Sequence, residues 1–142
     1  MSLVDTNRLI RQYLTTAAAL TNPLIALVGA RIYCPRLPEN ATLPAVSYFT
    51  RGGTADPIHP KYTSPSVQFD CWAANSIDAR EVYRTLYDAM QGLVSVSITV
   101  AGTAYYIMKV REEVQGQDLV DTEIQNYFRV LTFYSITIRN DS

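Results

Sequence analysis

The C-terminal third of the chain constrains the fold most, because it consists almost entirely of residues that favour β-strands. Strands are predicted at residues 96–100, 105–114 and 124–139, where Val, Ile, Tyr, Phe and Thr predominate. Ala101 and Gly102 are predicted to form a tight turn between the first two strands. Consecutive strands joined in this way predict hairpins, and hairpins predict an antiparallel sheet.

The spacing of apolar residues locates the other elements. Two amphipathic helices are predicted, over residues 6–20 and 76–91, with a short helical turn at residues 24–28. Three further strands are predicted, at residues 31–34, 45–50 and 66–73. The sequence therefore predicts an α+β fold, in which a mostly antiparallel sheet carries two main helices on one face.

A chain of 142 residues is long enough for a single domain, 1–142, with a core of its own. The core is predicted to combine the apolar stripes of both helices with the inward side chains of the strands. Its predicted members are Leu9, Ile10, Tyr13, Leu14, Val46, Val67, Phe69, Val82, Leu86, Met90, Val130 and Ile136.

Twelve basic and thirteen acidic residues give the chain a formal net charge of −1. Nonspecific binders of nucleic acids or anionic membranes need a basic surplus, so this balance argues against both classes. The chain has no apolar run near the roughly 20 residues of a membrane helix, and it begins without a secretory signal pattern. We therefore expect a soluble, intracellular protein.

The sequence offers little support for catalysis. His59 is the only histidine and lies between prolines in the predicted loop at residues 51–65, so no catalytic triad can be assembled around it. Gly52 and Gly53 lack the spacing of a phosphate-binding loop. The acids between residues 112 and 123 lack the pattern of a calcium loop. We therefore expect no enzyme, and no catalytic, cofactor-binding or metal-binding residue.

Three stretches carry a resemblance to a known family. They are NPLIALVGARIY at residues 22–33, LPAVSY at residues 43–48 and VQFDCWA at residues 67–73, the last followed by the helix at residues 76–91. In this order they resemble the tail-terminator or tail-completion proteins of long-tailed bacteriophages. The proline-containing loop at residues 51–65 departs from the family pattern.

The resemblance implies a structural virion protein without a cofactor, made in the cytoplasm of the bacterial host. Such proteins form a ring, typically a hexamer, on the tail tube, end tube growth and join the tail to the head-side connector. DNA passes through the lumen of the ring without specific binding. A head-completion protein or other neck adaptor remains an alternative, and a small-ligand-binding α+β domain or an enzyme is a more distant one.

Two sets of residues are candidate contact sites in such a ring. One set is the predicted interface with a neighbour, in the loop and on the last strand: Arg51, Asp56, His59, Lys61, Tyr127, Arg129, Phe133 and Tyr134. The edge of the strand at residues 105–114 is expected to contribute to it. The second set would line the lumen with acids: Glu112, Glu113, Asp118, Asp121 and Glu123. A solvated hairpin connection on the outside is the alternative for these acids.

Overall fold

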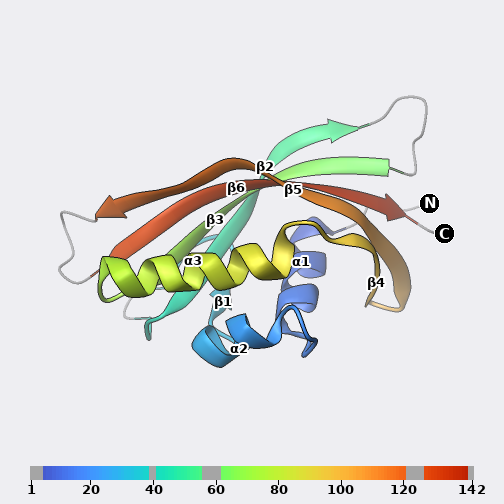
Figure 1. Cartoon of the computed structure of the whole chain (residues 1–142). Coiled ribbons are helices and arrows are strands. Elements are labelled where there is room, and N and C mark those ends of the chain that lie inside the picture. Colours follow the sequence, from blue (N-terminus) through green and yellow to red (C-terminus); the bar gives the residue numbers. More distant parts are fainter. Residues whose placement is uncertain (1–4, 39–40, 56–61, 121–126, 141–142) are drawn as a thin grey trace.

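The computed structural model describes residues 5–38, 41–55, 62–120 and 127–140 of the chain (Figure 1). These residues form one six-stranded, mostly antiparallel sheet and three helices, so the predicted α+β class is confirmed. The predicted order is also observed: a helix, a short helix, three strands, a helix and three strands.

The three helices are α1 (Thr6–Thr15), α2 (Asn22–Val28) and α3 (Ser76–Met90). Asp5 caps α1 by accepting a hydrogen bond from the amide of Arg8, and Asn75 caps α3 through the amide of Asp78. Helix α1 is shorter than predicted, because the backbone becomes extended at Thr16.

The six strands are β1 (Ile32–Tyr33), β2 (Ala45–Ala55), β3 (Tyr62–Ala73), β4 (Val94–Val100), β5 (Thr103–Val120) and β6 (Phe128–Asn140). They lie side by side in the order β1-β2-β3-β6-β5-β4, and only the β1–β2 pair is parallel. Ala101 and Gly102 both have positive φ, 51° and 84°, which is the backbone of the tight hairpin turn predicted between β4 and β5.

All three helices lie on one face of the sheet, and the core fills the space between the two layers (Figure 1). Every one of the twelve predicted core residues is buried, and none is more than 8% exposed. The buried Tyr13 hydroxyl also donates a hydrogen bond of 2.6 Å to the carbonyl of Ala89, which ties α1 to the end of α3. Among the described residues, no helix lies on the opposite face of the sheet (Figure 1).

Two segments that were predicted as connections are largely strand. In the predicted loop at residues 51–65, β2 continues to Ala55 and β3 begins at Tyr62, with a bulge between Thr50 and Gly53. In the predicted acidic connection, β5 continues to Val120. Pairing with neighbouring strands supplies the backbone hydrogen bonds here, and such pairing is invisible in the local sequence.

The predicted contact edge at residues 105–114 is corrected for residues 105–109, whereas residues 110–114 pair with β6 and not with β4. Strand β5 pairs with β6 along its length and with β4 from Thr103 to Lys109, so this half of β5 lies inside the sheet. Beyond Lys109, the backbone amide of Glu112 is taken by the side chain of Gln91 at 2.9 Å. The strand at this end of the sheet is β4.

Candidate interaction surface

The sheet face that the helices leave uncovered, here called the open face, carries the candidate site. Side chains alternate along β3 and β6, so every second residue points away from the core. The strand register brings three pairs together on this face: Gln68 with Phe133, Asp70 with Leu131, and Trp72 with Arg129. The open face is therefore a surface of polar, aromatic and basic side chains.

Three arginines on the open face lie over aromatic rings. The pairs are Arg51 with Phe133, Arg129 with Trp72 and Arg139 with Tyr106, at 5.0, 5.4 and 4.6 Å from guanidinium carbon to ring centroid. A cation over a ring face is attracted by the ring quadrupole, and the contact restrains the long arginine side chain. The guanidinium groups are thus positioned before any partner arrives.

A buried carboxylate links two of these arginines across three strands. Asp70 is only 6% exposed, although it lies on the uncovered face. Its Oδ1 lies 3.5 Å from Nη1 of Arg129, and its Oδ2 accepts a hydrogen bond of 3.3 Å from Gln68. Gln68 in turn accepts one of 3.4 Å from Arg51. The row Arg51–Gln68–Asp70–Arg129 therefore runs from β2 through β3 to β6.

The ionisation of Asp70 depends on Arg129. Burial raises the pKa of the Asp70 carboxyl, and the nearby Arg129 guanidinium and the Gln68 hydrogen bond lower it in part. Removing Arg129 would leave a buried carboxylate without its cation, so the pair acts as one unit.

Trp72 is held at the same site by its own contacts. Its indole Nε1 donates a hydrogen bond of 2.9 Å to Oγ of Ser47 on β2. The ring of Tyr127 meets the indole edge-on, with centroids 6.3 Å apart. Tyr127 therefore extends the aromatic part of the open face beyond the start of β6.

The structure brings together several of the predicted interface residues. Arg51 and Phe133 are in direct contact, and Arg129 and Tyr127 both pack on Trp72. Tyr134 is a correction: it is fully buried and points into the core, so it has no surface to offer a neighbour. The other predicted residues, Asp56, His59 and Lys61, lie outside the described residues.

The predicted acidic set does not form one surface. Glu112 points toward α3 and accepts hydrogen bonds from Tyr83 at 2.6 Å and from Thr132 at 2.7 Å. Asp118 lies on the same side and pairs with Arg80 at 3.2 Å. Strand alternation and a bulge separate them from Glu113, which accepts a hydrogen bond of 2.7 Å from Ser66 on the open face. Asp121 and Glu123 lie outside the described residues.

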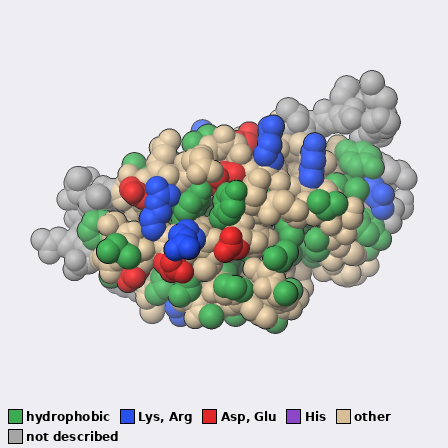
Figure 2. Space-filling view, in the orientation of Figure 1, with side chains coloured by type: hydrophobic (Ala, Val, Ile, Leu, Met, Phe, Trp, Pro, Cys, Tyr) green, Lys and Arg blue, Asp and Glu red, His purple; other side chains and the backbone are tan. Residues whose placement is uncertain are grey.

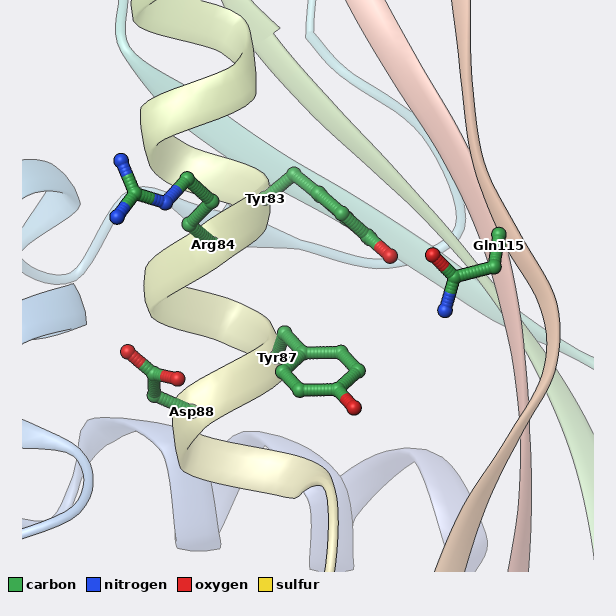
Figure 3. A pocket seen from close by; sticks show the side chains of 5 residues that line it. All are labelled: Tyr83, Arg84, Tyr87, Asp88 and Gln115. Carbon is green, nitrogen blue, oxygen red and sulfur yellow. The ribbon is translucent and has the colours of Figure 1, made fainter.

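A shallow pocket of about 250 Å³ lies between α3 and β5 (Figure 3). Tyr83 and Tyr87 point toward Gln115 on β5, whereas Arg84 and Asp88 point to the other side of the helix. Burial and the hydrogen bond to Glu112 raise the pKa of Tyr83 to about 12. The pocket thus presents the phenol groups of two tyrosines and the amide of a glutamine, all of which can form hydrogen bonds.

The described part of the chain holds no cluster of three His, Cys, Asp or Glu side chains that could bind a metal ion. Cys71 is buried and Cys34 is exposed, and both are free thiols. Burial raises the pKa of each thiol, and for Cys34 the charge of Asp5 adds to the rise.

Sequence reasoning missed Asp70 and Trp72 as parts of the site. A signal was present, because Gln68, Asp70 and Trp72 are the outward members of the alternating segment at residues 66–73. The contribution of Tyr106 and Arg139 depends on the pairing of β5 with β6 and has no local signal.

A comparison with protein-family models and with curated proteins finds no match for this chain. In the described residues, no helix has the length and apolar character needed to cross a membrane.

Proposed function

We propose that this chain is a structural assembly protein of the neck of a long-tailed bacteriophage. In this proposal it forms a ring at the head-proximal end of the tail tube, ends tube growth and joins the tail to the head-side connector. The ring is a hexamer in the proposal, and DNA passes through it without specific binding. The work of the protein is binding other subunits, without catalysis.

The observation that carries the proposal is the row of restrained side chains on the open face. Arg51 on β2 is far in the sequence from Arg129 and Phe133 on β6, and the fold holds the three side chains in one patch with Trp72. Aromatic residues and arginine are enriched in the contacts that dominate protein interfaces. A patch of this composition, already restrained, loses little side-chain entropy when a neighbour docks.

The architecture supports the proposal as well. A sheet covered by helices on one face only leaves a broad surface on the other face (Figure 1). A ring needs two different contact surfaces on each subunit, one for each neighbour. The open face supplies one such surface, and the helix-covered side of the molecule differs from it in composition.

The proposal is tested with tubes polymerised from the tail tube protein of the same phage. Adding the purified chain is expected to stop elongation and to leave a ring on one end of each tube in electron micrographs. The double variant Arg129→Ala/Phe133→Ser is expected to lose this effect, whereas the control Arg84→Ala, on the exposed side of α3, is expected to keep it.

Tubes that elongate freely, with bare ends, in an excess of the wild-type chain would refute the tail-terminator role. Binding to the purified connector instead of the tube would favour the alternative of a head-completion protein. Circular dichroism of the variants verifies that each one is folded.

A further inference from the structure

The edge of the sheet formed by β4 differs from the other strand edges of the molecule. Strand β4 pairs with β5 and lies at the end of the sheet (Figure 1). A strand at a sheet edge presents a row of backbone N–H and C=O groups that can pair with another chain. Native proteins protect such edges with charges, prolines, bulges, short strands or covering groups. An edge without these protections is open to an added strand.

The opposite edge of the sheet, at β1, is protected by its length and by existing hydrogen bonds. Strand β1 has two residues and is followed by Cys34 and Pro35. The N–H of Ile32 donates to the carbonyl of Ala30 at 2.8 Å. The carbonyl of Ile32 accepts a hydrogen bond of 3.3 Å from Nε of Arg11. The outward backbone groups of β1 are therefore already bonded.

The free parts of β2 and β5 are protected in other ways. Beyond its pairing with β1, β2 carries the charge of Arg51 and a bulge. Beyond its pairing with β4, β5 carries several charged residues, and its Glu112 amide donates to Gln91 at 2.9 Å. Its Gly116 amide donates to the hydroxyl of Tyr83 at 3.2 Å. A strand added at either place would meet charges, a bulge or amides that are already bonded.

Strand β4 has none of these protections in its composition. Its sequence, VSVSITV, contains no charged residue, no proline and no glycine. In the space-filling view, acidic and basic side chains gather over α3, and β4 contributes none of them (Figure 2). Valine, isoleucine and threonine favour extended backbone, so this composition favours pairing with a further strand.

The two-residue turn after β4 determines which of its backbone groups face outward. The turn makes Val100 and Thr103 a hydrogen-bonded pair. Bonded and non-bonded residues then alternate along an antiparallel pair. Ile98 therefore bonds to β5, whereas the backbone groups of Ser97 and Thr99 face the free edge. Both residues are exposed, and no residue that the structure describes bonds these groups.

We propose that the edge of β4 is a strand-addition site, at which an extended segment of another protein pairs with Ser97 and Thr99. Each of the two residues offers one N–H donor and one C=O acceptor, and an extended backbone presents the complementary groups at the same spacing. A helix has bonded these groups internally and cannot supply them. The site therefore fits an extended polypeptide.

The side chains of β4 indicate the composition of the added segment. Ile98 and Val100 are buried in the core, and Val96 is partly buried against it. Ser97 and Thr99 alternate with them and have small polar side chains. Side chains directly across two strands contact each other, and β4 has no charge for a charged neighbour to pair with. The segment is therefore uncharged, with apolar β-branched residues alternating with small polar ones.

A second copy of the chain fits this edge less well than a flexible segment does. A stable contact between two folded proteins buries about 800 Å² on each partner. A strand of seven residues with two outward residues supplies only part of such an area. An extended segment needs only the strand edge. The inference does not depend on the proposed function, because strand addition is measurable without tail tubes or the connector.

The test uses a synthetic peptide of alternating valine and threonine, with a lysine at each end, and the isotope-labelled full chain. NMR follows peptide binding and the hydrogen exchange of individual amides. The peptide is expected to bind at β4 with a Kd of about 1 mM or below. At a free concentration of about ten times Kd, it is expected to slow exchange of the Ser97 and Thr99 amides about tenfold. The Ile98 amide, which already bonds to β5, is expected to change less.

Matched variants separate strand addition from other modes of binding. Ser97→Pro removes an outward N–H, and proline is tolerated where the N–H of an edge strand faces solvent. It is expected to weaken binding about fivefold or more, because a hydrogen bond is lost. Ser97→Ala keeps the N–H and is expected to bind within about twofold of the wild type. Thr99→Pro takes the place of Ser97→Pro if the NMR spectrum shows that the latter is unfolded.

A control peptide with proline in place of each threonine is expected not to bind, since it lacks half of the donors. The inference is overturned by no binding of the valine–threonine peptide at about 10 mM, by shifts that map away from β4, or by equal binding of the control peptide. Wild-type affinity in the folded proline variant would overturn it as well. Dimerisation of the chain alone, lost in that variant, would assign the edge to a second copy instead.

Discussion

At the scale of single residues, Glu112 and Tyr83 form a polar contact between sheet and helix. The Glu112 carboxylate accepts hydrogen bonds from Tyr83 and Thr132, and the Tyr83 hydroxyl accepts one of 3.2 Å from the amide of Gly116. Replacing Tyr83 with Phe is expected to lower the free energy of unfolding at pH 7 by about 1 kcal/mol, the usual net value of a hydrogen bond.

The pH dependence of the Tyr83→Phe variant gives a sharper prediction. Burial, and next the hydrogen bond to Glu112, raise the pKa of Tyr83 from 10.0 to about 12 in the folded chain. Between these values the folded chain keeps a proton that the unfolded chain has lost, so stability falls with pH by about 1.4 kcal/mol per unit for this group. Urea unfolding from pH 9 upward is therefore expected to show the wild-type and variant curves converging and then crossing between the two pKa values, because the fall for this group exceeds the difference of about 1 kcal/mol at pH 7.

Tyr13 provides an internal control for this experiment. Burial raises its pKa to about 12 as well, and it is present in both proteins, so the difference between the curves isolates Tyr83. Parallel curves over the whole range would mean that the Tyr83 hydroxyl is not held as described.

At the scale of elements, the bulge in β2 depends on a close approach that only glycine permits. Gly53 has φ of +129°, and a Cβ placed there would lie 2.3 Å from the carbonyl oxygen of Ser64 and 2.5 Å from Cα of Pro65, both backbone atoms of β3. The Gly53→Ala variant is therefore expected to lose about 2 kcal/mol or more in its free energy of unfolding, measured with urea. The new methyl group must push β2 away from β3, and this cost adds to the strain of an alanine at positive φ.

Gly52 is the matched control for the bulge. Its φ is +95°, but a Cβ there would have no atom within 4 Å. The Gly52→Ala variant therefore carries backbone strain without a clash, and a loss of about 1 kcal/mol is expected. Equal losses for the two variants would argue against the close approach of β2 and β3 at Gly53.

At the scale of the whole molecule, stability is expected to decrease from the middle of the sheet to its end. Strands β3 and β6 are paired on both sides and packed against α3, whereas β4 is paired on one side only and carries exposed residues such as Val94, at 71%. In native-state hydrogen exchange, the slowest amides are expected in β3 and β6, and those of β4 are expected to exchange faster. A β4 as protected as β3 in the monomer would contradict this order.

Local patterns in the sequence were sufficient for the order of elements and for the core. The alternation at residues 66–73, the helical spacing at residues 76–91 and the turn at Ala101 and Gly102 each depend on neighbours within a few residues. Burial of all twelve predicted core residues follows from the same patterns, because apolar periodicity defines the buried face of a helix or strand.

The length of the strands, the faces of the charged residues and the composition of the candidate site were decided only by tertiary structure. Backbone pairing with β3 and β6 extends β2 and β5 through segments whose composition is typical of loops, and the resulting strand alternation in β5 places Glu112 and Glu113 on opposite faces. Arg51 meets Phe133 because β2, β3 and β6 are neighbours in the sheet, which no local pattern encodes. The sequence alone determined the twelve predicted core residues, since their burial follows local periodicity, but it did not predict the burial of Tyr134 or Asp70. The sheet order decided which exposed residues meet, since that depends on long-range pairing.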